Sequence, residues 1–348
     1  MIKVGVIGFG MSAQVFHCPL IDSNDSYELA AVVERHGAKS QAKYPHVRVV
    51  RSIDELLAIS DIELVIVTTP NDTHVPYAKQ ILESGKHCVV EKPFAVTETE
   101  ARELAAVAKK TGKVLSVFQN RRWDGDFLTV KQLLLEKALG DVVEIESRFD
   151  RFRTYKKPNA WREVASFPGS GVLYDLGAHL FDQIVDLYGP PEFVTGNVRN
   201  ERQIDGAPDD SFLVVLDYPS LNFKAVCRAG MLVRDKPPRF TVLGTRGTFT
   251  KFGLDVQEQQ LKDGLTPRDT AYGKDNEFGT LDSEVLPKIN VRGQVATLDG
   301  NYAAYYNNVA AAIRGDEQLI VTPEQAVSVI RIIELAKQSS EERRTMSF

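Results

Sequence analysis

Apolar residues form short runs along the first third of the chain, and amphipathic segments separate the later runs. The runs have the length and composition of buried strands. They are Lys3–Ile7, Leu29–Val33, Leu64–Val67, Cys88–Val90 and Val114–Phe118. Apolar residues at helical spacing predict helices from about His74 to Glu83 and from about Glu98 to Thr111. This alternation predicts a doubly wound parallel sheet of the Rossmann type, with its ligand at the carboxyl ends of the strands.

Beyond Trp123 the pattern changes. A helix near Phe127 to Glu136 leads into strand-like runs that have few helices between them. These runs are Val142–Phe149, Phe193–Val198, Phe212–Leu216, Phe223–Leu232, Phe240–Leu243 and Thr248–Phe252. They predict a mostly antiparallel sheet that is open on one face, within an α+β domain. We therefore expect an α/β protein with a dinucleotide-binding domain at 1–121 and a substrate-binding and oligomerisation domain at 122–348.

The last hundred residues combine a polar stretch with two helical patterns. Residues from about Val256 to Thr297 are rich in polar and turn-forming side chains, which predicts a long surface excursion. Helices are expected at Tyr302–Arg314, which Gly315 ends, and from Pro323 to about Ser340.

Composition limits the classes of partner. With 348 residues and 43% hydrophobic side chains, the chain can bury a core in each of two domains. A net charge of −5 argues against nucleic acid or an anionic membrane as a partner. No signal region or membrane-length apolar run is evident, so we expect a soluble cytoplasmic protein. The cysteines Cys18, Cys88 and Cys227 lie far apart among apolar residues, which is typical of buried thiols in a reducing compartment.

A glycine-rich turn follows the first strand. Gly8-x-Gly10-x-x-Ala13 has the spacing of a turn that holds a dinucleotide diphosphate at the start of a helix. The second strand ends in Glu34, where a carboxylate would meet the adenosine ribose. The alternative interpretation is an ordinary tight turn of an α/β domain.

Polar clusters follow three further strands of the predicted sheet. They are Thr68-Thr69-Pro70-Asn71, Glu91-Lys92-Pro93 and Gln119-Asn120-Arg121-Arg122-Trp123. Because parallel strands end at the same edge of a sheet, we expect these clusters on one edge.

The segment Gly169 to His179 is a second candidate site. Its small residues allow a close approach of the backbone, and a helix that opens at Asp175 would place His179 one turn later on the same face. The alternative is a helix-capping aspartate with a histidine hydrogen-bonded to it.

Together these motifs resemble the glucose-fructose oxidoreductase, inositol dehydrogenase and MocA-like (Gfo/Idh/MocA) family, and within it the bacterial NADP-dependent scyllo-inositol dehydrogenases. The resemblance runs nearly end to end. It rests on the glycine turn, Thr69-Pro70-Asn71 with His74, Glu91-Lys92-Pro93, Asn120 to Asp124, Trp161-Arg162, Gly169 to His179, and Asn301-Tyr302 with Tyr305-Tyr306.

The resemblance implies hydride transfer between a nicotinamide and the carbon that bears a sugar or polyol hydroxyl. Lys92 and His179 are the candidates for handling the hydroxyl proton, and Asp175 would orient His179. His179 as the base, with Lys92 polarising the oxygen, and the opposite assignment both remain open. A cis peptide is expected at Lys92-Pro93, as in relatives.

Further residues are assigned to the two ligands. The cofactor set is Gly8, Gly10, Met11, Ser12, Ala13, Glu34, Arg35, Thr69, Pro70, Asn71, His74, Glu91, Lys92, Gln119, Trp161 and Arg162. The substrate set is Lys92, Asn120, Arg122, Trp123, Tyr155, Asp175 and His179. The remaining histidines at 17, 36, 46 and 87 are interpreted as structural, and no metal is expected.

Cofactor preference and activity each leave alternatives. Glu34 favours NAD because it would repel a 2′-phosphate, whereas Arg35 could pair with that phosphate and favours NADP, which we prefer slightly. A non-catalytic dinucleotide sensor is one rival function. Another is a reductase of an aldose, an anhydro-sugar or a small carbonyl compound. We expect a homo-oligomer, a dimer or a tetramer, formed through the C-terminal sheet.

Overall fold

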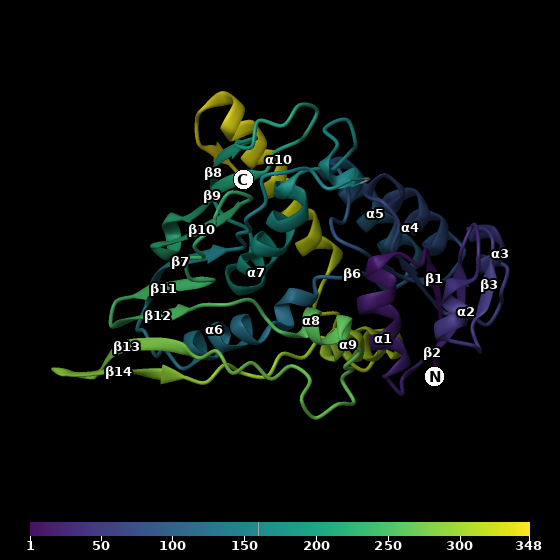
Figure 1. Cartoon of the computed structure of the whole chain (residues 1–348), viewed down its shortest axis with the longest axis horizontal. Helices are drawn as coiled ribbons and strands as arrows, with labels where there is room; N and C mark the ends of the chain where they lie inside the picture. The colour runs from purple at the N-terminus through teal and green to yellow at the C-terminus, as the bar shows by residue number, and fades with distance from the viewer. Residues whose placement is uncertain (159) are drawn as a thin grey trace. The chain divides into compact units, whose positions relative to one another are not determined.

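A computed structural model describes residues 1–158 and 160–348, and it divides into two compact units. The first unit comprises Met1–Trp123, Val256–Gly273 and Asn301–Val327. The second comprises Asp124–Asp255, Lys274–Gly300 and Ser328–Phe348. Figure 1 labels the elements along the chain.

A six-stranded parallel sheet forms the first unit. Its strands are β1 (Ile2–Ile7), β2 (Tyr27–Val33), β3 (Arg48–Val50), β4 (Leu64–Val67), β5 (His87–Val90) and β6 (Leu115–Val117). Their order is β3-β2-β1-β4-β5-β6, and every neighbouring pair is parallel. This order confirms the predicted doubly wound fold, in which the strand order reverses beside β1 and ligands bind at the carboxyl edge.

The helices of this unit include three near the predicted ranges His74–Glu83, Glu98–Thr111 and Tyr302–Arg314. The unit contains α1 (Cys18–Asp22), α2 (Lys39–Lys43), α3 (Ile53–Leu57), α4 (His74–Glu83), α5 (Glu98–Thr111), α8 (Gln257–Lys262) and α9 (Ala303–Arg314). The helix α5 begins at a capping box, in which Thr97 accepts from the Glu100 N–H and Glu100 reaches back to the Thr97 N–H. It ends at Gly112, whose φ of 66° a residue with a side chain would rarely adopt.

The second unit contains a nine-stranded sheet. Its strands are β7 (Val142–Arg148), β8 (Phe193–Arg199), β9 (Ser211–Tyr218), β10 (Phe223–Gly230), β11 (Phe240–Gly244), β12 (Gly247–Lys251), β13 (Gly279–Leu286), β14 (Ile289–Val295) and β15 (Met346–Ser347). The order is β14-β13-β12-β11-β7-β10-β9-β8-β15. The strands β7 and β10 run parallel, and the other neighbouring pairs are antiparallel. The predicted α+β domain with a mostly antiparallel sheet is therefore confirmed.

Helices α6 (Gly125–Leu135), α7 (Ala178–Tyr188) and most of α10 (Pro323–Glu342) belong to the second unit. The strand β8 and α10 approach closely, because a Cβ at Gly196 would lie 2.2 Å from the Ala336 carbonyl oxygen. Ser339 and Ser340 accept hydrogen bonds from the N–H groups of Gly196 and Val198.

The surface excursion predicted between Val256 and Thr297 is correct only in part, because much of the segment is exposed but it contains regular structure. The segment forms α8 and the hairpin β13–β14, and β13 pairs with β12. The backbone of β13 and β14 extends the sheet through hydrogen bonds, and the side chains of β14 are mostly exposed. A polar edge strand has no apolar pattern, so composition alone favoured a loop.

Two smaller expectations concern the whole chain. Among the described residues, no helix combines the length and apolarity needed to cross a membrane. The three cysteines are buried free thiols, as predicted.

Candidate active site

The glycine turn after β1 leaves room for a ligand. Gly8 has a φ of +94°, and a Cβ there would lie 3.2 Å from Thr68 Oγ1, so glycine suits both the conformation and the space. A Cβ at Gly10 would meet no atom within 4 Å, so the side of the turn at Gly10 is open. The turn runs into a π-helical turn, Ala13–His17, in which Ala13 is buried. The turn therefore fits the diphosphate of a dinucleotide.

A chain of hydrogen-bonded polar groups links this turn to Glu91. Ser12 Oγ donates to Glu91 Oε1, and His17 Nε2 lies 2.9 Å from the same oxygen. His17 Nδ1 lies 2.5 Å from the Tyr306 hydroxyl, and the His17 side chain has no exposed surface. Burial alone would raise the pKa of Glu91, but the hydrogen bond and charge of His17, with Lys92 and Ser12, lower it to about 2. His17 thus has a structural role, as predicted, and links the glycine turn to the Glu91-Lys92-Pro93 motif.

His74 joins two of the predicted strand-end clusters. Its Nδ1 lies 2.8 Å from the Pro93 carbonyl oxygen, and its Nε2 lies 2.9 Å from the Thr69 carbonyl oxygen. Because a carbonyl oxygen only accepts, forming both bonds at once requires a proton on each ring nitrogen. The Lys92-Pro93 peptide is cis, as expected. Lys92 follows β5, and its N–H lies 3.0 Å from Glu91 Oε2.

Glu34 organises the loop after β2. Its carboxylate accepts from Ser40 N at 2.8 Å, Ser40 Oγ at 2.6 Å and Lys39 N at 3.0 Å. Burial would raise the pKa of this carboxyl, but these hydrogen bonds and the nearby Arg51 lower it below its usual value. Arg35 is exposed in the same loop. The roles predicted for Glu34 and Arg35 in cofactor binding stay predictions.

The cluster after β6 is largely buried. Arg121 forms an ion pair with Glu258 at 2.8 Å. Arg122 Nη1 donates to the Ile320 carbonyl oxygen at 3.2 Å and to Gln325 Oε1 at 3.1 Å. These contacts give both guanidinium groups a role in the packing of the first unit. Gln119 and Asn120 are also buried, and Trp123 packs edge-on against Tyr305, with ring centroids 5.7 Å apart.

Asp175 and His179 lie on one helical run of the second unit. The run begins with a π-helical turn, Leu173–Gly177, and continues as α7. Asp175 lies inside this run and does not open it. The cap comes from Asp209, whose Oδ2 accepts from Leu173 N at 2.7 Å. Burial raises the pKa of Asp209 to about 6, and the Leu173 hydrogen bond and the charge of Lys337 offset this only in part.

Two arginines flank Asp175. Arg151 Nη1 lies 3.9 Å from Asp175 Oδ2, and Arg162 Nε lies 3.7 Å from Oδ1. The Arg162 guanidinium stacks 4.2 Å from the centroid of Trp161. The structure thus brings the predicted residues Trp161, Arg162 and Asp175 together and adds Arg151, which the sequence analysis missed.

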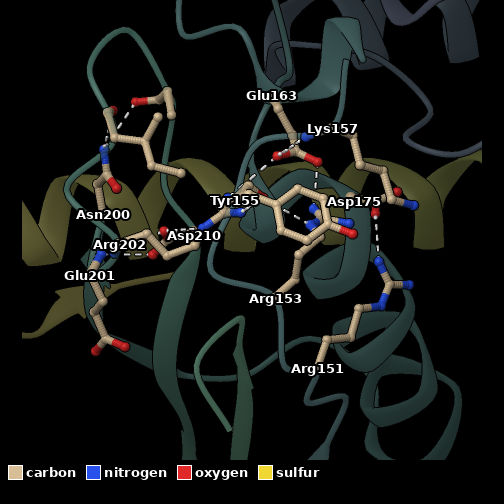
Figure 2. A network of polar contacts seen from close by, with 12 residues as sticks. Arg151, Arg153, Tyr155, Lys157, Glu163, Asp175, Asn200, Glu201, Arg202 and Asp210 are labelled. Atoms are coloured by element: carbon tan, nitrogen blue, oxygen red, sulfur yellow. Dashed lines mark hydrogen bonds and ion pairs between the residues drawn. The ribbon is translucent and has the colours of Figure 1, made fainter. Parts of the chain in front are cut away.

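An ion-pair network supports the turn that carries Trp161 and Arg162 (Figure 2). Glu163 accepts from Arg153 Nη2, and Arg202 Nη2 lies 3.5 Å from Glu163 Oε2. Arg202 Nε also donates to Asp210 Oδ2 at 2.7 Å. Tyr155 lies in the same view; its side chain is exposed, and its carbonyl oxygen accepts from Arg202 Nη1 at 2.8 Å.

Two family models together match most of the chain. The oxidoreductase family model for an NAD-binding Rossmann fold matches residues 2–119, and the model for its C-terminal alpha/beta domain matches residues 131–348. The chain belongs to the Gfo/Idh/MocA oxidoreductase family.

Several named relatives match this Gfo/Idh/MocA protein along nearly its whole length. It is 43% identical to the uncharacterized oxidoreductase YdgJ of Escherichia coli over 99% of this chain and 98% of the relative. It is 37% identical to the scyllo-inositol 2-dehydrogenase (NADP(+)) IolW of Bacillus subtilis, over 99% and 95%. A solved structure of the oxidoreductase yvaA from Bacillus subtilis aligns over all of both chains, with a TM-score of 0.93 and 36% identity.

Family membership sets the general activity. The Gfo/Idh/MocA protein is an NAD(P)-dependent oxidoreductase of the dehydrogenase type. Lys92 lies in the first unit and Asp175 and His179 in the second. Their joint action on one substrate atom stays a prediction.

Proposed function

We propose that the protein transfers a hydride between NADP and the hydroxyl-bearing or keto carbon of a cyclic polyol, with an inositol-like ring as the substrate class. The observation that carries this proposal is the 37% identity to a named NADP-dependent scyllo-inositol dehydrogenase, which extends over 346 residues. The aligned region is 99% of this chain and so spans nearly all of the two units that carry the glycine turn, Lys92 and the Asp175–His179 run.

The proton-transfer residues suit oxidation of an alcohol. When the carbon loses its hydride, the hydroxyl proton must also leave, and an imidazole or a lysine amine can accept it. We assign the base to His179 and the polarisation of the substrate oxygen to Lys92. Asp175 stabilises the imidazolium that forms, as a carboxylate does beside a catalytic histidine. A nicotinamide cofactor held at the glycine turn would supply the hydride acceptor.

The preference for NADP is supported by the loop after β2. Hydrogen bonds from Ser40 and Lys39 already occupy the Glu34 carboxylate, so it is engaged within its own loop. Arg35 and Lys39 are exposed there and carry positive charge. We therefore assign the 2′-phosphate to Arg35 and a loop-forming role to Glu34.

We also propose self-association, as a dimer or a tetramer, through the sheet of the second unit. Partly exposed apolar side chains on this sheet support the proposal, among them Leu213 on β9 and Ile289 and Val291 on β14. A second copy of the same sheet would cover such side chains.

A substrate panel tests the proposed activity. The purified protein is mixed with scyllo-inositol, myo-inositol and several aldoses, each with NAD or NADP, and the absorbance of the reduced nicotinamide is followed. We expect turnover of a cyclic polyol with NADP. Turnover of an aldose alone would identify an aldose reductase instead. Tight cofactor binding without turnover of any compound would favour the rival function of a dinucleotide sensor.

A further inference from the structure

Asp209 holds the start of the helical run that carries Asp175 and His179. The first N–H groups of a helix lack partners within the helix. Here the Leu173 N–H donates to Asp209 Oδ2 at 2.7 Å, and the Val172 N–H donates to the Asp209 carbonyl oxygen at 3.1 Å. Asp209 lies just before β9, so the run is attached at its origin to the sheet.

Gly171 fits closely against the same carboxylate. A Cβ at Gly171 would lie 2.2 Å from Asp209 Oδ1, and the φ of Gly171 is +98°. The turn that enters the helix and the Asp209 side chain thus constrain each other. Asp175 follows within the first helical turn, and its N–H donates to the Gly171 carbonyl oxygen at 3.0 Å.

Asp210 holds a different segment. Its buried carboxylate accepts from Glu201 N at 2.7 Å and from Arg202 N and Nε at 3.1 and 2.7 Å. Arg202 continues to Glu163, which ends the short turn that carries Trp161 and Arg162. The Asp210 backbone is fixed too, because its N–H donates to the Arg199 carbonyl oxygen at 2.9 Å.

We propose that Asp209 is a positioning residue for the Asp175–His179 run, next to Asp210, which contacts the Trp161–Arg162 turn through Arg202 and Glu163. The inference rests on the proposed function, because that function assigns Asp175 and His179 to the reaction with the substrate. Asp209 and Asp210, which come directly before β9, thereby hold the Asp175–His179 run and the Trp161–Arg162 turn at fixed places relative to each other. Small displacements of catalytic groups are costly, since an error of about 1 Å can reduce a rate by about 100-fold.

The first test separates positioning from general stability. Asp209→Ala removes the acceptor for the Leu173 N–H, and we expect kcat with scyllo-inositol and NADP to fall about 10- to 100-fold. The KM for NADP should stay unchanged, because the glycine turn belongs to the first unit. Asp209→Asn keeps an oxygen acceptor and should restore kcat to within a few fold. Asp205→Asn, an exposed change in the same loop, is the matched control and should behave as wild type.

A second readout does not depend on turnover. In protein labelled with 13C-histidine, the His179 Cε1–H signal is identified by its loss in His179→Asn. We expect Asp209→Ala to move this signal and Asp209→Asn and Asp205→Asn to leave it in place. The His87 signal, from the first unit, should not move in any of them. If Asp209→Ala does not fold, Asp209→Glu replaces it, because the longer side chain displaces the acceptor.

The two readouts separate the proposals. A moved His179 signal without turnover of any polyol would overturn the proposed substrate class and support the positioning role. An unchanged His179 signal and an unchanged kcat in folded Asp209→Ala would overturn the positioning role, whatever the substrate. Equal loss in Asp209→Ala and Asp209→Asn would also overturn it, since the acceptor would then be irrelevant.

Discussion

The Gly8–His17 segment of the first unit and the Gly169–Gly177 segment of the second are built alike but differ in their surroundings. Each contains a glycine with φ above +90°, namely Gly8 and Gly171, and each enters a π-helical turn. In the first segment a Cβ at Gly10 would meet open space. In the second a Cβ at Gly171 would strike the carboxylate of Asp209. The first segment is open for a ligand, whereas the second is filled by the protein itself.

The two segments share one local feature, a glycine of positive φ before a π-helical turn, but its surroundings differ. Single π-helical turns occur mostly within α-helices and are frequent at functional sites. At Gly10 the missing side chain leaves open space, where we expect the backbone to approach a dinucleotide. At Gly171 the missing side chain admits a carboxylate that caps the helix, and the functional groups that we propose there are the later side chains Asp175 and His179.

The largest expected effects come from removing a proton-transfer group in either unit. Lys92→Ala and His179→Ala should each lower kcat by about 10²- to 10⁴-fold, while NADP affinity measured by calorimetry stays near wild type. Their combined loss should be smaller than the product of the two, because both groups act on the same substrate hydroxyl. Near-normal turnover in Lys92→Ala would contradict the assignment.

Alanine substitutions at Gly171 and Gly10 should affect different properties, the stability of the fold at Gly171 and the affinity for NADP at Gly10. Gly171→Ala forces a Cβ against Asp209 in a left-handed conformation, so the free energy of unfolding should fall by about 2 kcal/mol or more. Gly10→Ala should leave the free energy of unfolding nearly unchanged and weaken NADP binding. Urea unfolding and calorimetry on both variants check this contrast. Equal losses of stability would contradict the open character of Gly10.

A smaller effect is expected at the cofactor's phosphate. Arg35→Ala removes a charged hydrogen bond, which is worth about 1.5 to 3 kcal/mol, so the KM for NADP should rise about 10- to 150-fold. The KM for NAD should change little. Steady-state kinetics with both cofactors give the comparison, and Arg48→Ala, an exposed arginine on β3, is the control. Equal rises for both cofactors would refute the assignment.

The last contrast concerns pH, because the carboxyl groups of Glu91 and Asp209 should change stability in opposite directions. The Glu91 pKa of about 2 lies below its unfolded value, so Glu91 stabilises the fold above about pH 4.5, and this stabilisation is lost as pH falls toward 2. The Asp209 pKa of about 6 lies above its unfolded value. Asp209 therefore favours the fold at low pH, and stability falls as pH rises from about 4 to 6.

Urea unfolding of the matched amide variants between pH 3 and 8 checks these signs. Glu91→Gln should lose most stability at neutral pH and least in acid. Asp209→Asn should be more stable than wild type at pH 8, and the difference should vanish near pH 4. Each unit of pKa difference corresponds to about 1.4 kcal/mol. If Asp209→Asn were instead less stable than wild type at pH 8, the pKa of Asp209 would be lowered by folding and not raised, which would contradict this prediction.

Sequence patterns predicted the elements whose side chains are buried. They missed strands that are held mainly by backbone hydrogen bonds. The run Leu64–Val67 is buried throughout and was recognised as a strand, whereas β3, β14 and β15 carry too few buried side chains to form a pattern. The glycine turn was found because its spacing is local.

The same limit applies to the site. The capping of Leu173 by Asp209 and the approach of Arg151 to Asp175 join residues far apart in the sequence, and neither residue stands in a recognisable motif. Lys92, Asp175 and His179 were predicted from short motifs and the family resemblance. Their supporting residues could be found only after folding had brought distant segments together.

The most direct test is a crystal structure of the protein with NADPH and the polyol that the substrate panel identifies. The central claim is that one lysine of the first unit and one histidine of the second act on the same substrate oxygen. We predict that Lys92 Nζ and a ring nitrogen of His179 each lie about 2.6 to 3.2 Å from that oxygen, directly or through one water. A closed complex in which either group lies farther from it than one water can bridge would contradict the account.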